Sequence, residues 1–105
     1  MRNVILICID TLAAKHLGCY GWWRNTSPNI DKFAKDAILF DNAYANNNAT
    51  HPSFTTILTG RHPLSHEIIA HQGKKTLSRN IPLISEILKE NGLVLLISMN
   101  LLTTL

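Results

Sequence analysis

The sequence has no long apolar run, few cysteines and no cluster of basic residues. The apolar run at residues 4–9 ends at Asp10, well short of a membrane span or the apolar core of a signal peptide. Without a visible export signal we expect no disulfide between Cys8 and Cys19, and we interpret both as structural thiols rather than a redox pair. These absences predict a cytoplasmic protein without a membrane partner.

Residues of like charge are not clustered anywhere along the chain. Ten basic residues against seven acidic ones give a formal net charge of +3, which weakly favours an anionic partner. Only Lys74 and Lys75 are adjacent. A nucleic-acid-binding face needs clustered basic side chains with aromatic ones between them, so we expect no nucleic-acid partner.

The composition is that of a chain that folds. Its hydrophobic fraction is 46% and its charged fraction 16%, values that exclude a disordered chain and a coiled coil. A length of 105 residues gives room for one domain but not for two.

The first apolar run carries the clearest structural signal. Residues 4–9 are continuously apolar and rich in β-branched side chains, as in a strand buried on both faces of a parallel sheet. Asp10 follows at the carboxyl end of this strand, where open α/β sheets bind their ligands.

Hydrophobic periodicity and turn residues predict the other elements. They are a helix over 28–36 that begins at Ser27-Pro28, a strand over 38–45, a helix over 52–58, a loop over 61–80, a helix over 83–90 and a strand over 93–99. This order predicts an α/β fold with a parallel or mixed sheet flanked by helices. Three strands leave both sheet edges open, so we expect association through exposed edges and a truncated chain.

Two residues occupy positions at which α/β proteins often bind ligands. Asp10 ends a strand, and Thr50 precedes a predicted helix whose N-terminus suits a tetrahedral oxyanion such as sulfate or phosphate. An aspartate at a strand end more often caps a turn, and a threonine before a helix more often caps the helix. Taken alone, the residues leave both interpretations open.

Seven segments of the chain resemble, in order and spacing, the N-terminal part of the sulfatase family within the alkaline phosphatase superfamily. The similarity covers about residues 3 to 92. The segments are 3–12, 16–21, 26–31, 40–44, 52–53, 58–63 and 81–92.

The resemblance implies a fold and an activity. The fold is a partial alkaline-phosphatase-like sandwich with a mostly parallel central sheet and flanking helices, of which residues 1–105 form a truncated N-terminal portion. The activity is the hydrolysis of sulfate or phosphate esters through a covalent intermediate, with a small anionic ester as substrate. The implied cofactor is a divalent metal, whether calcium, magnesium, manganese or zinc.

Carried over residue by residue, the resemblance assigns Asp10 to the first metal-binding aspartate of the family. Thr11 stands where many members have a second aspartate. Thr50 takes the nucleophile position, in the frame that runs from 50–53 to 59–61. Threonine cannot give the formylglycine aldehyde, and Phe54 replaces the arginine of the maturation motif, so formylglycine is not expected.

The residues around Thr50 support two hypotheses. A threonine alkoxide is the nucleophile in superfamily relatives that act on phosphate esters, whereas a sulfatase-like protein without its nucleophile would be inactive. His51 and Arg61 are candidates to support the site, although a histidine here is as readily a surface residue. Trp22-Trp23 is interpreted either as the lining of a substrate cleft or as packing of a loop against the core.

The family completes its metal site far downstream with an Asp-Asn or Asp-His pair. One aspartate and one threonine cannot make a closed oxygen-rich site of about six ligands. We therefore expect these 105 residues alone to be inactive, either as part of an ester hydrolase or as a non-catalytic product without activity of its own.

Overall fold

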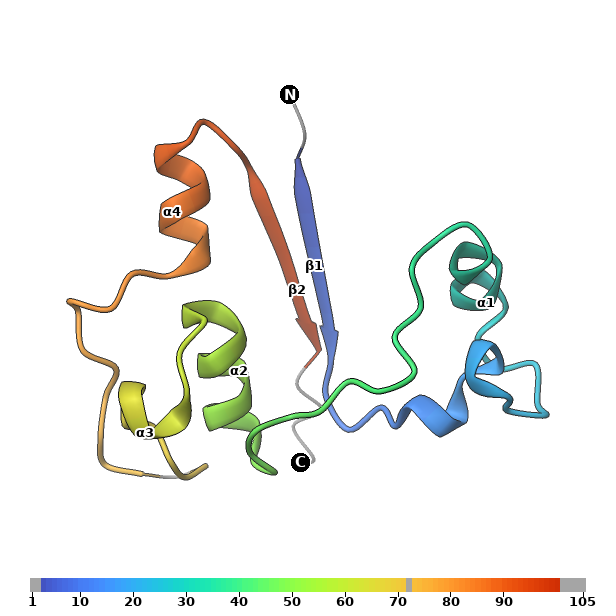
Figure 1. The fold of residues 1–105 in the computed structure, drawn as a ribbon, viewed down its shortest axis with the longest axis horizontal. Coiled ribbons are helices and arrows are strands. Elements are labelled where there is room, and N and C mark those ends of the chain that lie inside the picture. The colour runs from blue at the N-terminus through green and yellow to red at the C-terminus, as the bar shows by residue number, and fades with distance from the viewer. Residues whose placement is uncertain (1–2, 72, 101–105) are drawn as a thin grey trace. The chain divides into compact units, whose positions relative to one another are not determined.

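A computed structural model of the chain describes residues 3–71 and 73–100. The chain forms two compact units, one made of residues 1–8 with 45–105 and the other of residues 9–44. Figure 1 shows the elements of both units along the chain. Residues 101–105, at which we expect the chain to be truncated, lie outside the described residues.

The first unit contains a two-stranded parallel sheet. Its strands are β1 (Val4–Ile9) and β2 (Leu95–Asn100), whose arrows run in the same direction in Figure 1. The Val4 N–H donates to the carbonyl oxygen of Val94 at 3.1 Å. The mixed α/β class and the strand over 4–9 are confirmed, and the strand expected over 93–99 begins two residues later.

The first unit also contains three helices, one of which packs against the sheet. They are α2 (Thr50–Thr59), α3 (Pro63–His66) and α4 (Ile84–Glu90), and α2 packs against α3 and α4 while α4 packs against β2. Gly60 ends α2 in a left-handed conformation, φ 65°, and its N–H donates to the Thr56 carbonyl oxygen. The short helix α3 lies inside the segment expected to be a loop, so that expectation was wrong for 63–66.

The second unit is built around α1 (Pro28–Ala34), which packs against a single 3-10 turn at Gly18–Tyr20. Another 3-10 turn precedes it at Ala14–His16. The helix expected over 28–36 is therefore confirmed, and it ends two residues early. The strand expected over 38–45 is wrong, because no residue of this segment pairs in a sheet.

Apolar side chains remain open to solvent in both units. Among the described residues, no alanine, valine, leucine, isoleucine, methionine, phenylalanine, tyrosine, tryptophan or cysteine is classed as buried. Ile5 and Ile7 on one face of β1 are each 65% exposed, whereas Leu6 and Cys8 on the other face are half-buried. Burial of this strand on both faces was therefore wrong for the chain as described.

No helix in the described part of the chain is both long enough and apolar enough to cross a bilayer.

Candidate functional site

Thr50 is the first residue of α2, and the residues around it fix the start of this helix. Ala49 stands at the N-cap position in an extended conformation, φ −112° and ψ 146°. The Ala49 N–H donates to the Asn47 side-chain oxygen at 2.9 Å, and the Ser53 hydroxyl donates to the Asn47 carbonyl oxygen at 3.0 Å. Pro52 is fully buried in the first turn. Asn47 and Ser53 therefore lock the backbone that presents Thr50.

Thr50 lines a cavity of about 270 Å³ together with basic and apolar side chains. His51 and Lys75 also line this cavity. The His51 ring stacks on the His71 ring, with their centroids 4.2 Å apart and their planes at 28°. A cavity that combines a hydroxyl with an ammonium and an imidazole suits an anionic ligand better than a cationic one.

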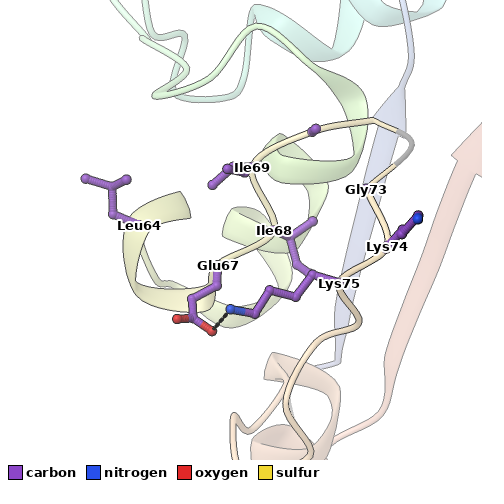
Figure 2. A pocket seen from close by; sticks show the side chains of 8 residues that line it. Leu64, Glu67, Ile68, Ile69, Gly73, Lys74 and Lys75 are labelled. Carbon is purple, nitrogen blue, oxygen red and sulfur yellow. Dashed lines mark ion pairs between the residues drawn. The ribbon is translucent and has the colours of Figure 1, made fainter.

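A second cavity of about 570 Å³ shares part of its wall with the Thr50 cavity. Ile68, Ala70, Gly73 and Lys75 line both of them. Figure 2 shows the ion pair between Lys75 and Glu67, whose Nζ and Oε2 atoms are 2.6 Å apart. Both side chains are 59% exposed, so water screens this pair and leaves the Lys75 ammonium available to an anion.

His66 holds the far part of α2 to α3. It is only 2% exposed, and both of its ring nitrogens are hydrogen-bonded. Nδ1 accepts the Ile68 N–H at 3.1 Å, so the proton of the neutral ring is on Nε2, which lies 3.1 Å from the Thr56 hydroxyl. The sequence analysis did not single out His66, because its structural role has no local signal in the sequence.

Arg61 and His62 follow α2, and the hydrogen bonds described for them lie at its C-terminal end and at the start of α3. The Arg61 backbone N–H donates to the Thr59 hydroxyl at 3.2 Å, and the Arg61 side chain is exposed. Nδ1 of His62 accepts the Leu64 N–H and so caps α3. The supporting roles of Arg61 and His51 stay predictions.

Asp10 belongs to the second unit and shapes the turn after β1. Its carboxylate accepts the Thr11 N–H at 3.0 Å, and Thr11 has a left-handed backbone, φ 60°. A β-branched residue with positive φ is strained, and such strain is found preferentially at functional sites. The roles of Asp10 as metal ligand and of Thr50 as nucleophile stay predictions.

The described residues do not gather a complete metal site. Within 3–71 and 73–100, no group of three or more His, Cys, Asp or Glu side chains lies close enough to hold a metal ion. A metal-binding role for Asp10 therefore stays a prediction, because one carboxylate does not supply the roughly six oxygen ligands that such an ion needs.

A polar clamp that the sequence analysis missed holds the second unit together. The Ser27 hydroxyl accepts the Gly18 N–H at 3.0 Å and donates to the Asp31 carboxylate, which also accepts the Cys19 N–H at 2.8 Å. Partial burial raises the pKa of the Cys19 thiol, and the Asp31 charge raises it further. Ser27 stands at the N-cap position of α1, in agreement with the predicted helix start, but its hydroxyl bonds within this clamp rather than to a backbone N–H of the helix.

Comparisons with known proteins agree on one family. The family model described as Sulfatase matches residues 2–103. Iduronate 2-sulfatase of Mus musculus and that of Homo sapiens are each 39% identical over 93 residues, which is 88% of this chain and 17% of either relative. Arylsulfatase A of Homo sapiens is 39% identical over 62 residues, 59% of this chain and 12% of that protein. The chain thus spans less than a fifth of the length of these relatives, and no solved structure matches it.

Proposed function

Since this chain belongs to the sulfatase family, we propose that it contributes the nucleophile-bearing part of an enzyme that hydrolyses sulfate or phosphate esters. In the proposal, the parallel strands and helices are part of an alkaline-phosphatase-like sandwich. Thr50 is the nucleophile, and a small anionic ester is the substrate. The relatives are named as sulfatases, which supports the class of ester.

The position of Thr50 is the observation that carries this proposal. Thr50 is the first residue of α2, and the resemblance to the family assigns it to the nucleophile position. It lines the same cavity as Lys75 and His51, so an anion there would meet a hydroxyl and two basic side chains. The hydrogen bonds of Asn47 and Ser53 support this arrangement, because they hold the turn from which Thr50 projects.

The proposed reaction has two balanced steps. In the first, a bond forms between Thr50 Oγ1 and the sulfur or phosphorus, the bond to the alcohol oxygen breaks, and the hydroxyl proton leaves with the alcohol. In the second, water attacks the same sulfur or phosphorus, and the bond to Thr50 Oγ1 breaks with return of a proton. The products are the alcohol and inorganic sulfate or phosphate.

A divalent metal belongs to the proposal only through the family. The described residues alone do not fit such an ion, because Asp10 is a single carboxylate and about six oxygen ligands are needed. Asp10 therefore stands as the one ligand that this segment would contribute.

Two side chains favour phosphate over sulfate esters. Thr50 and Phe54 together remove the cysteine-to-formylglycine route, whereas a threonine hydroxyl is a competent nucleophile for phosphoryl transfer. The same two residues also fit a protein without activity, which is the second candidate.

The two lysines offer a matched pair of variants for testing the Thr50 cavity. Lys75 lines this cavity, whereas Lys74 lines only the neighbouring one. The assay measures hydrolysis of an aryl phosphate and an aryl sulfate by the longest translated frame that contains these residues, with divalent metal added. We expect Lys75→Ala to raise KM about threefold to tenfold and Lys74→Ala to leave it unchanged, because only the first loses a cation beside the anion. If both variants changed KM equally, the Thr50 cavity would not be the place where the anion binds.

A further inference from the structure

The larger cavity beside the Thr50 cavity has no part in the reaction described above. This cavity of about 570 Å³, here named the Leu64 cavity, shares Ile68 and Lys75 with the Thr50 cavity. Every residue that lines either cavity belongs to the first unit, so their adjacency does not depend on where the second unit lies. The two cavities adjoin, and Lys75 lines both.

Apolar side chains from α3 and from the loop after it form most of the wall of the Leu64 cavity. Leu64 on α3 is 78% exposed, Ile69 in the loop is 63% exposed, and Ile68 is half-buried. Figure 2 shows these three side chains on the segment that leads from α3 to the loop. A ligand that removes such exposed apolar surface from water gains affinity from each apolar group that it places there.

The paired charges of the Leu64 cavity are those of Lys75 and Glu67. Figure 2 shows the Lys75 side chain directed toward Glu67 and the Lys74 side chain directed away from this ion pair. The backbone N–H groups of Glu67 and Ile68 are already bonded to α3, at 2.8 and 3.1 Å. The cavity therefore has a charged part at Lys75, which it shares with the Thr50 cavity, and an apolar part at Leu64 and Ile69.

We propose that the Leu64 cavity binds the alcohol part of the ester and that this part is an apolar chain or ring. The inference rests on the proposed function, because that function has the sulfate or phosphate group beside Thr50. An anion held at the Lys75 ammonium leaves the rest of the ester within reach of the Leu64 cavity, because Lys75 lines both cavities. The alcohol part then covers Ile68 and Ile69.

The choice of an apolar alcohol follows from the chemistry of the wall. Each hydroxyl group that moves from water to an apolar wall without a partner lowers the affinity, whereas each CH₂ group raises it. Leu64, Ile68 and Ile69 offer no hydrogen-bond partner from their side chains. The Leu64 cavity therefore selects an apolar alcohol over a polyhydroxylated one.

A series of alkanesulfonates tests this selection without turnover, because their carbon–sulfur bond is not an ester bond. Binding of methane-, butane- and heptanesulfonate to the longest translated frame that contains these residues is measured by isothermal titration calorimetry. We expect the affinity to rise about twofold for each added CH₂ group, because full burial gives about fourfold and this wall is partly open to water. Heptanesulfonate should bind about fivefold more tightly than 6-hydroxyhexanesulfonate, which has the same length and a terminal hydroxyl.

Three variants separate the apolar contact from the charge contact. Leu64→Ser and Ile69→Ser each remove an apolar side chain from the Leu64 cavity and not from the Thr50 cavity. Each should weaken heptanesulfonate about threefold and leave methanesulfonate unchanged, which also shows that the anion site is intact. Lys75→Ala should weaken all the sulfonates by the same factor. Ile57→Ser is the matched control, because Ile57 is exposed on α2 and lines neither cavity.

The inference is overturned if the affinity does not depend on chain length, if 6-hydroxyhexanesulfonate binds as tightly as heptanesulfonate, or if Ile57→Ser weakens heptanesulfonate as much as Leu64→Ser does. Absence of sulfonate binding would overturn it as well. Hydrolysis is measured separately, so the two proposals can fail independently. Chain-length dependence without hydrolysis would contradict only the proposed function, and hydrolysis without chain-length dependence would contradict only this inference.

Discussion

Replacing Gly18 with alanine should break the polar clamp of the second unit. A β-carbon at Gly18 would overlap Oδ2 of Asp31 and lie 2.8 Å from its carboxylate carbon. The carboxylate can rotate away, but it then leaves the Ser27 hydroxyl and the Cys19 N–H, which are bonded to it at 3.0 and 2.8 Å. Hydrogen bonds to a charged group contribute about 1.5–3 kcal/mol each, and partial exposure lowers this range.

The net effect of Gly18→Ala on the free energy of unfolding can be worked out from these terms. Two weakened bonds cost about 2–4 kcal/mol, and alanine returns about 0.4–1 kcal/mol by restricting the unfolded chain. We therefore expect a loss of about 1–3 kcal/mol in urea unfolding followed by tryptophan fluorescence, since both tryptophans lie in this unit. Gly73→Ala is the control, because its β-carbon meets nothing closer than 3.9 Å. An unchanged urea midpoint for Gly18→Ala would refute the clamp.

Two other predictions concern buried and titratable groups. His66→Ala should lower the free energy of unfolding by about 2–4 kcal/mol, because it removes a buried ring and leaves the half-buried Thr56 hydroxyl and Ile68 N–H without their partner. The exposed Ser65→Ala should change little, and equal urea midpoints for the two variants would contradict this prediction. The pKa of Cys19 is raised above its ordinary value of 9.0, so the unfolded chain loses this proton at a lower pH than the folded chain does. The folded state therefore loses stability as pH rises above 9.0, and the Cys19 thiolate of the folded protein forms at a higher pH than that of a free cysteine. In a Cys8→Ser background, Asp31→Asn should therefore shift the alkylation-rate profile of Cys19 to lower pH, and an unshifted profile would exclude the charge effect.

The sequence predicted correctly those elements that are determined by neighbouring residues in the chain. Residues 4–9 form a strand because a continuous β-branched run has few alternatives, and Ser27-Pro28 marks the start of α1 because proline is preformed for a first turn. The segment 38–45 failed because its alternation is imperfect and strand formation needs a neighbour, which this segment does not find. The helix expected from Pro52 begins at Thr50, since proline is tolerated throughout a first turn.

The candidate site likewise contains residues that the sequence could identify and contacts that it could not. Thr50 and Asp10 could be named from motif order, because spacing along the chain carries that information. The clamp of Ser27 with Asp31, and the bond from His66 to Thr56, join residues whose pairing depends on how turns fold back. No periodicity encodes such contacts, so they became visible only in the structure.

The central claim is that Thr50 is a nucleophile, and a paired assay of Thr50→Ala and Thr50→Ser tests it most directly. Both variants are made in the longest translated frame that contains these residues, and hydrolysis of aryl phosphate and aryl sulfate is measured with divalent metal added. We predict that Thr50→Ala abolishes turnover, that Thr50→Ser retains part of it because a hydroxyl is still present, and that phosphate is preferred over sulfate. Sulfate hydrolysis that survives Thr50→Ala would contradict the claim and place the nucleophile elsewhere.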